Sequence, residues 1–141
     1  MTVTLSTDNR PHDWMRTSRL EGLVALVAGG GSGIGEAASR IIAANGGKVA
    51  VTDLKEDAAS IVAAAIAGDG GEAISAGMDV SIQAEIDVAV AATTEKWGRL
   101  DIVINCAAAV LPGRLEDWDI DRWRKSFEVN VEGAIMLART C

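Results

Sequence analysis

Glycine recurs at short intervals in one segment that directly follows an apolar run. Residues 29–35 read GGGSGIG, and they lie between the apolar residues 23–27 and a stretch with helical periodicity. Glycine lets the chain turn sharply and lets a phosphate approach the main chain closely. The first N–H groups of a following helix have no partner within the helix and favour an anion. This spacing therefore predicts a turn that binds the pyrophosphate of a dinucleotide.

An acidic side chain follows the next apolar run. Asp53 lies 18 residues after Gly35, near the distance at which a carboxylate meets an adenosine ribose. A carboxylate there accepts hydrogen bonds from the ribose hydroxyls and repels a 2′-phosphate. Neither Ser32 nor Leu54 is an arginine that would bind a 2′-phosphate, although Lys55 lies one residue further on. The glycine turn and Asp53 together predict NAD as the cofactor in preference to NADP.

Short apolar runs alternate with longer helical patterns, which is typical of consecutive βαβ units with a parallel sheet. We expect strands at Leu23–Ala28, Lys48–Thr52, Glu72–Ala76 and Ile102–Asn105. Crossovers between parallel strands are right-handed. The pattern therefore predicts an α/β, Rossmann-like parallel sheet with the strand order 3-2-1-4 and helices on both faces.

Apolar periodicity also predicts which side of each helix packs against the sheet. The inward positions expected in the first helix are Ile34, Ala37, Ala38, Ile41 and Ala44. Those expected in the second helix are Ala58, Ile61, Val62, Ala65 and Ile66. Ser81 is the expected N-cap of the third helix and Asp119 that of the last one. The last helix is expected to turn Trp123, Phe127, Val131, Ala134 and Ile135 inward.

The composition narrows the classes of partner. The 141 residues are 49% hydrophobic, which suffices for one domain with a packed core. Twenty acidic residues against 13 basic ones give a net charge of −7, which opposes binding to nucleic acid. Apolar stretches end well before the roughly 20 residues that a membrane span needs. We therefore expect neither nucleic acid nor a membrane as a partner.

The ends of the chain and its cysteines indicate the compartment. Residues 1–14 are polar and lack the apolar core of a signal peptide. Cys106 and Cys141 have neither disulfide-framework nor zinc-ligand spacing. We therefore expect a cytoplasmic protein without a metal site.

Residues 1–18 lack periodicity and are expected to form a flexible arm before a dinucleotide-binding domain over residues 19–141.

Five landmarks occur in order along the chain. They are Gly29-x-x-x-Gly33-x-Gly35, Asp53, Asp79-Val80, Asn105-Cys106-Ala107-Ala108 and Asn130-Val131. With these intervals, the sequence from Leu20 to Cys141 resembles the short-chain dehydrogenase/reductase family.

The resemblance implies a role for each landmark. It implies that the pyrophosphate and the nearby ribose are bound by Gly29, Ser32, Gly33, Ile34 and Gly35. It implies that Asp53, followed by Leu54, binds the adenosine ribose, that Asp79 and Val80 flank the adenine, and that Asn105 and Ala107 line the cofactor cleft. Asn130 matches the asparagine of the family's catalytic Asn-Ser-Tyr-Lys set, which holds a water in the proton relay.

The sequence also departs from the family pattern. Ala28 replaces a usual threonine, and Cys106-Ala107-Ala108 replaces Asn-Ala-Gly. Because both changes are small in volume, we expect weaker local hydrogen bonding and a retained cleft. In the family the catalytic Ser and Tyr-x-x-x-Lys follow the next strand, whereas these 141 residues contain no tyrosine. We therefore expect the cofactor-binding part of such a fold, truncated on its C-terminal side, without the phenol that would exchange the proton.

Three function hypotheses follow. The first is an NAD-dependent oxidoreductase that transfers hydride between NAD and a secondary alcohol or ketone, with this chain inactive alone and the complete protein a homo-oligomer. The second is a non-catalytic nucleotide-binding or interaction module. The third is a methyltransferase-like nucleoside binder, against which the three residues between Gly29 and Gly33 argue. Because the family continues the sheet beyond the fourth strand, we expect Ile102–Asn105 to be an edge and the chain to be marginally stable and to self-associate.

Overall fold

The structure is a computed structural model that describes residues 20–110 and 112–141. The predicted arm, residues 1–18, lies outside the described residues. Four parallel strands form one sheet: β1 (Val24–Ala28), β2 (Lys48–Asp53), β3 (Glu72–Gly77) and β4 (Ile102–Asn105). Their order is β3-β2-β1-β4, so the predicted order is confirmed and β4 is an edge of the sheet in the described part of the chain.

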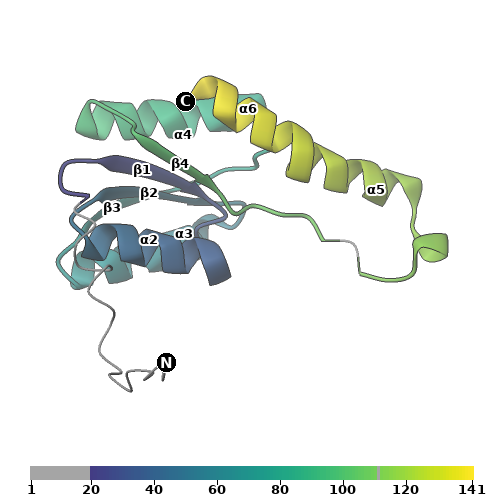
Figure 1. Cartoon of the computed structure of the whole chain (residues 1–141), viewed down its shortest axis with the longest axis horizontal. Helices are drawn as coiled ribbons and strands as arrows, with labels where there is room; N and C mark the ends of the chain where they lie inside the picture. Colours follow the sequence, from purple (N-terminus) through teal and green to yellow (C-terminus); the bar gives the residue numbers. More distant parts are fainter. Residues whose placement is uncertain (1–19, 111) are drawn as a thin grey trace, which may run out of the picture.

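Helices cover both faces of this sheet, as predicted (Figure 1). The helices α2 (Gly33–Ala44) and α3 (Glu56–Gly68) lie on one face, and α4 (Gln83–Trp97) and α6 (Gly133–Thr140) lie on the other. A 3₁₀ turn, η1 (Leu115–Asp117), precedes α5 (Ile120–Phe127). A π-helical turn, η2 (Glu128–Glu132), joins α5 to α6. The single last helix that periodicity predicts is therefore made of three segments.

The core consists of two layers, one on each side of the sheet. Val27 and Val49 face α2 and α3 in the first layer, and Leu26 faces α4 and α6 in the second. Every residue of β1 is buried, because helices cover both faces of a parallel sheet. The crossovers run from β1 outward in both directions, so the strand order reverses at β1. In open α/β sheets, ligands bind at the carboxyl ends of the strands beside such a reversal.

The inward face predicted for α2 is wrong. Ile34 and Ile41 are 81% and 51% exposed, while Gly35, Ser39 and Ile42 are buried against the sheet. The small residues face inward because α2 approaches the strands closely, and the Ser39 hydroxyl is satisfied by donating to the Gly35 carbonyl. Of the remaining predicted positions, Ala38 is half-buried and Ala37 and Ala44 are exposed.

The prediction for the next two helices holds only in part. In α3, Val62 and Ile66 are buried as expected, but Ile61 is 70% exposed. The expected N-cap Ser81 is wrong, because α4 begins one residue later, after Ile82. Asp79 explains the shift, since its Oδ1 accepts hydrogen bonds from both the N–H and the hydroxyl of Ser81.

The last helical region also turns a different side inward from the one predicted. Its large apolar side chains are exposed, namely Trp123, Phe127, Val131 and Ile135. The buried residues of α6 are instead Gly133 and Leu137, with Ala134 half-buried. A Cβ on residue 133 would lie 2.8 Å from the Val80 carbonyl oxygen. Gly133 therefore allows α6 to contact the loop after β3 closely, whereas a larger residue at this position would clash with that loop. The Asp119 N-cap is confirmed, because its side chain accepts from the Asp121 N–H.

One carboxylate joins β1 and β4 at the amino-terminal edge of the sheet, away from the glycine turn. The Asp101 Oδ2 accepts from the Val24 N–H at 2.9 Å, and Arg99 forms an ion pair with the same carboxylate. These bonds hold the pKa of Asp101 below its ordinary value of 3.8, chiefly through Arg99.

Among the helices of the described residues, none combines the length and apolar character needed to cross a bilayer.

Candidate functional site

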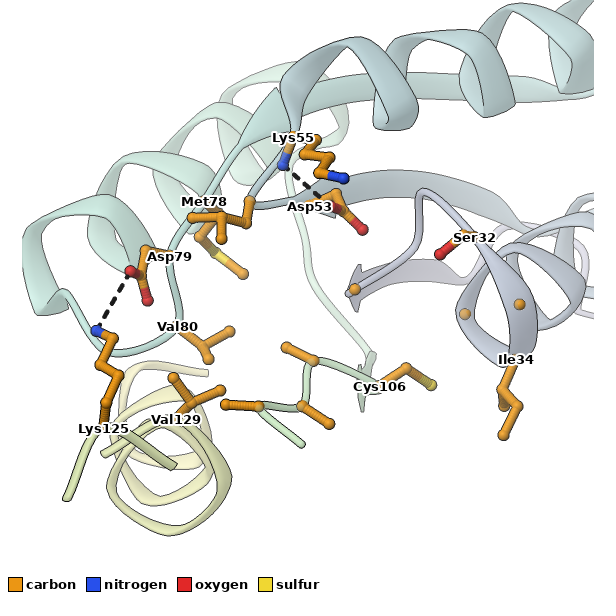
Figure 2. Close-up of a pocket in the computed structure, with 17 residues that line it drawn as sticks. Ser32, Ile34, Asp53, Lys55, Met78, Asp79, Val80, Cys106, Lys125 and Val129 are labelled. Atoms are coloured by element: carbon orange, nitrogen blue, oxygen red, sulfur yellow. Dashed lines mark hydrogen bonds and ion pairs between the residues drawn. The ribbon is translucent and has the colours of Figure 1, made fainter. Parts of the chain in front are cut away.

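A cavity of about 520 Å³ lies at the carboxyl ends of the strands (Figure 2). It brings together all but one of the residues predicted to bind the cofactor: Gly29, Ser32, Gly33, Ile34, Gly35, Asp53, Leu54, Asp79, Val80 and Ala107. These residues come from the carboxyl end of β2, from the loops after the four strands and from the first turn of α2, as expected where the strand order reverses. The exception is Asn105, which lies outside the lining.

The glycine turn packs closely on both of its neighbours. Gly29 has φ +71°, and a Cβ there would lie 2.6 Å from the Ala107 backbone nitrogen. A Cβ on Gly35 would lie 2.1 Å from the Gly29 carbonyl oxygen. A side chain at position 29 would push the glycine turn away from the loop after β4. A side chain at position 35 would push α2 away from the glycine turn. The two glycines therefore set the shape of this side of the cavity.

The first turn of α2 is open toward the cavity. A Cβ at Gly33, which has φ +55°, would meet nothing within 4 Å. The N-cap residue Ser32 makes no side-chain capping hydrogen bond, and its side chain lines the cavity beside Ile34. Because the first N–H groups of a helix lack intrahelical acceptors, this end of α2 can donate hydrogen bonds to phosphate oxygens.

The backbone fixes the orientation of the Asp53 carboxylate. Its Oδ2 accepts from the Gly31 N–H at 3.1 Å, and its Oδ1 accepts from the Lys55 N–H at 3.0 Å. The turn is joined to β2 a second time, because the Gly30 N–H donates to the Thr52 carbonyl at 2.8 Å. Asp53 thus remains half-buried at the cavity wall with its acceptor oxygens in place.

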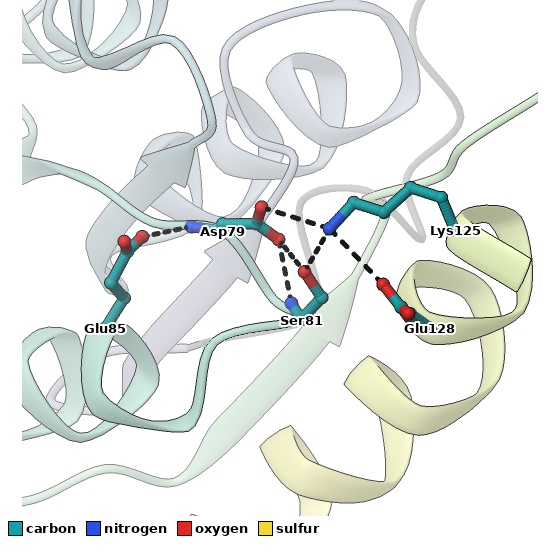
Figure 3. A network of polar contacts seen from close by, with 5 residues as sticks. All are labelled: Asp79, Ser81, Glu85, Lys125 and Glu128. Atoms are coloured by element: carbon teal, nitrogen blue, oxygen red, sulfur yellow. Dashed lines mark hydrogen bonds and ion pairs between the residues drawn. The ribbon is translucent and has the colours of Figure 1, made fainter. Parts of the chain in front are cut away.

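A polar network surrounds Asp79 on another side of the cavity (Figure 3). Lys125 of α5 places its Nζ 2.7 Å from the Ser81 hydroxyl and 3.7 Å from Asp79 Oδ2. Glu85 accepts from the Asp79 N–H at 2.7 Å, and Glu128 lies 3.6 Å from Lys125. Burial raises the pKa of the Asp79 carboxyl, but the hydrogen bonds from Ser81 and the charge of Lys125 outweigh burial and lower the pKa below 3.8.

Asn130 binds the loop after β4. Its Oδ1 accepts from the Ala109 N–H, and its Nδ2 donates to the Ala109 carbonyl, each at 2.9 Å. The Ser126 hydroxyl donates to the same carbonyl and accepts from Asn130. Asn130 lies in the π-helical turn, a feature that is frequent at functional sites, but it is not among the residues that line the cavity. Asn105 acts on the same loop, since its Oδ1 accepts from the Ala107 N–H at 3.1 Å.

The cavity also contains residues that the sequence analysis did not assign to it. Besides Lys55, they are Met78, Cys106, Ala108, Ala109, Lys125 and Val129. Met78, Cys106, Ala108 and Ala109 adjoin predicted site residues, so their neighbours in the sequence could have indicated them. Lys125 and Val129 carry no such signal, because they reach the cavity only where α5 and η2 return beside the loop after β3. Within the described residues, no three His, Cys, Asp or Glu side chains gather as a metal site would require.

Comparisons with known proteins agree with this arrangement. The family model for short chain dehydrogenase matches residues 23–141. The chain is 40% identical over 113 residues to a 2,5-dichloro-2,5-cyclohexadiene-1,4-diol dehydrogenase of Sphingobium indicum, an alignment that covers 80% of this chain and 45% of that relative. It is 32% identical over 121 residues to the D-threitol dehydrogenase of Mycolicibacterium smegmatis, with 86% and 46% covered.

A solved structure shares the fold as well. The hydroxysteroid dehydrogenase from Escherichia coli superimposes with a TM-score of 0.81 at 30% sequence identity, over 86% of this chain and 52% of that one. The chain thus spans about half the length of the curated relatives that it matches. The resemblance seen in the sequence is confirmed: the chain belongs to the short-chain dehydrogenase/reductase family.

Proposed function

We propose that this chain binds NAD in the cavity at the carboxyl edge of the sheet. One observation carries the proposal: the open first turn of α2 and the oriented carboxylate of Asp53 line the same cavity. A dinucleotide needs both features, since its pyrophosphate requires N–H donors and its adenosine ribose requires an acceptor. The cavity volume of about 520 Å³ lies within the usual range for ligand pockets.

The preference for NAD over NADP rests on Asp53. Its carboxylate accepts from ribose hydroxyls but repels a 2′-phosphate, and the two backbone N–H groups prevent it from turning away. The neighbouring Leu54 offers no positive charge to a 2′-phosphate. Lys55 lines the cavity too, so its charge opposes the preference in part.

We infer further that the whole protein is an oxidoreductase acting on a secondary alcohol or ketone. Relatives named as dehydrogenases of a cyclohexadiene diol and of threitol support this substrate class. When bound, the nicotinamide supplies the hydride acceptor or donor. In this chain, Asp79 and Val80 would flank the adenine, and Asn130 would keep the β4 loop against the cavity through Ala109.

A second candidate is a nucleotide-binding module without turnover. The observation that favours it is that these 141 residues contain no tyrosine to exchange a proton with an alcohol oxygen. Both candidates predict that the 141-residue chain binds NAD, and both predict no alcohol oxidation by this chain alone. They differ for the longer protein, in which only the first candidate predicts turnover.

The proposal includes a homo-oligomer and a cytoplasmic location. The exposed stripe of Trp123, Phe127, Val131 and Ile135 supports association with a second copy, because such side chains are normally covered. The two cysteines, Cys106 and Cys141, form no disulfide, which supports a reducing compartment.

Titration calorimetry of the 141-residue chain tests the proposed cofactor. We expect one NAD per chain and weaker binding of NADP. Equal or tighter binding of NADP would refute the preference, and no heat with either dinucleotide would refute the site. NADH production from secondary alcohols should stay at background, and turnover that Asn130→Ala abolishes would show catalysis that does not need a tyrosine.

A further inference from the structure

Lys125 connects α5 to the wall of the cavity at Asp79. Figure 2 shows Lys125 beside Asp79 at one side of the cavity, with Ser32 and Ile34 at the other. The Lys125 side chain is 52% exposed, whereas the Asp79 side chain is 18% exposed. The contact therefore joins a flexible surface cation to a carboxylate that is largely enclosed.

The direction of each hydrogen bond in this network follows from the donors available. An ammonium group only donates, so the Ser81 hydroxyl oxygen must accept from Lys125 Nζ at 2.7 Å. The single hydroxyl proton of Ser81 is then directed to Asp79 Oδ1 at 2.6 Å. The Ser81 N–H donates to the same oxygen at 2.8 Å. Lys125 thus fixes the Ser81 hydroxyl, and Ser81 fixes the rotation of the Asp79 carboxylate.

Lys125 is also the cation that balances the local negative charge. In the network of Figure 3, Asp79, Glu85 and Glu128 are acidic and Lys125 is basic. Without its ammonium group, the loop after β3 would lose the cation that Asp79 shares with Glu128, since Lys125 Nζ lies 3.7 Å from the one carboxylate and 3.6 Å from the other. We expect such a loop to lose its single arrangement because like charges repel.

The attachment of α5 depends on polar contacts of this kind. None of the residues of α5 is buried, so packing contributes little to its position. Lys125 bonds to Ser81, and Ser126 bonds to the Ala109 carbonyl. Both contacts end on loops that line or adjoin the cavity, so the position of α5 and the shape of this wall depend on each other.

We infer that Lys125 is a positioning residue for the nucleotide base, because it orients the Asp79 carboxylate through Ser81. Lys125 thereby determines how well the cavity distinguishes adenine from a base that lacks the adenine amino group. The inference rests on the proposed NAD site. An ionised carboxylate only accepts hydrogen bonds, so it favours the amino group of adenine over the carbonyl oxygen of hypoxanthine. This discrimination requires an oriented carboxylate.

The test compares NAD with nicotinamide hypoxanthine dinucleotide by titration calorimetry on the 141-residue chain. The unmodified chain should bind NAD more tightly. Lys125→Met should reduce this preference about two- to fivefold, as expected for loss of a charged contact at a partly exposed site. Lys125→Arg should restore most of it. Arg124→Met is the matched control, because Arg124 is the adjacent cation on α5 and pairs with Asp121, and it should leave the preference unchanged.

A double-mutant cycle tests the route through Ser81. Ser81→Ala should reduce the preference as Lys125→Met does, and the double variant should lose no more than either single variant, because both act through one network. A purely structural role for Lys125 would change the melting temperature but leave the ratio of the two affinities unchanged. An unchanged ratio in Lys125→Met, or equal affinities in the unmodified chain, would overturn the inference and leave the NAD site intact. If the unmodified chain binds neither dinucleotide, the NAD site and the inference both fail.

Discussion

The carboxylate of Asp53 accepts a hydrogen bond from the backbone N–H of Gly31, with 3.1 Å between Oδ2 and the nitrogen. A Cβ at Gly31 would lie 2.9 Å from the same oxygen, so this contact needs a glycine. The residue that we propose for ribose recognition is thus bonded directly to the turn that we propose for the pyrophosphate. The two parts of the site form one unit.

Asp53→Ala should narrow the preference for NAD over NADP. Removing the carboxylate removes its repulsion of a 2′-phosphate, a difference worth about 1 to 3 kcal/mol at a partly shielded site. Asp53→Asn keeps an acceptor for the Gly31 N–H but loses the charge, so it should also narrow the preference while preserving the melting temperature better. Competition titrations with both dinucleotides measure the ratio. Asp57→Ala, at an exposed position in the first turn of α3, should leave it unchanged.

Gly35→Ala should destabilise the fold by about 2 to 3 kcal/mol, because overpacking forces neighbouring atoms to move. The new methyl group would lie 2.1 Å from the Gly29 carbonyl oxygen. Gly68→Ala is the matched control in a helix, since a Cβ there meets nothing within 4 Å, and it should be neutral or stabilising. Urea unfolding measures both. Equal stabilities of the two variants would contradict the close packing of α2 on the turn.

Replacing Trp123 and Phe127 together by glutamine should shift the chain toward the monomer. The two rings stack with centroids 5.5 Å apart, yet they are 42% and 47% exposed. The stacked pair contributes about 0.5 to 1.5 kcal/mol to the stability of the monomer beyond the area that it buries, so some loss of intramolecular stability should accompany the change. Sedimentation velocity measures the association. Ile61→Gln, at a 70% exposed position of α3, is the control, and an equal effect of this control would show unspecific aggregation.

The free energy of unfolding should decrease in acid, in part because the Asp101 carboxylate becomes protonated. Its folded-state pKa lies below 3.8, chiefly because of the hydrogen bond with Arg99 and then that from the Val24 N–H. A lowered pKa contributes stability that is fully present above the ordinary pKa and is lost as the pH falls through the folded pKa. Asp101→Asn should therefore be less stable than the unmodified chain at pH 6, and the difference should shrink below pH 3.8. Urea unfolding across this pH range checks it, and a constant difference would contradict the account.

The strands could be predicted from the sequence because most of their residues are apolar and lie buried or half-buried between the two helical layers. Runs such as Val24–Ala28 and Ile102–Asn105 then stand out from the polar loops. The inward faces of α2 and α6 could not be predicted in this way. Their buried positions include Gly35, Ser39 and Gly133, since close approach to the strands or to a loop excludes large side chains. Periodicity of apolar residues therefore selected a neighbouring side of each helix, on which the large apolar residues are exposed.

Some residues of the candidate site could likewise be predicted from the sequence, and others could not. Gly29 and Asp53 could be placed from their positions at the ends of strands, because the carboxyl ends of parallel strands meet at one edge. The contacts of Lys125 with Ser81 and of Asn130 with Ala109 could not be placed. They depend on how α5 and the π-helical turn return to the sheet, which no local pattern in the sequence specifies.

The location of the NAD site is tested most directly by nuclear magnetic resonance of the ¹⁵N-labelled 141-residue chain during titration with NAD. We predict the largest amide shifts at Gly33, Gly35, Asp53 and Val80, which line the cavity. The amides of Val24 and Asp101, at the amino-terminal edge of the sheet, should not move. Shifts concentrated at that edge, or no shifts at millimolar NAD, would contradict the account.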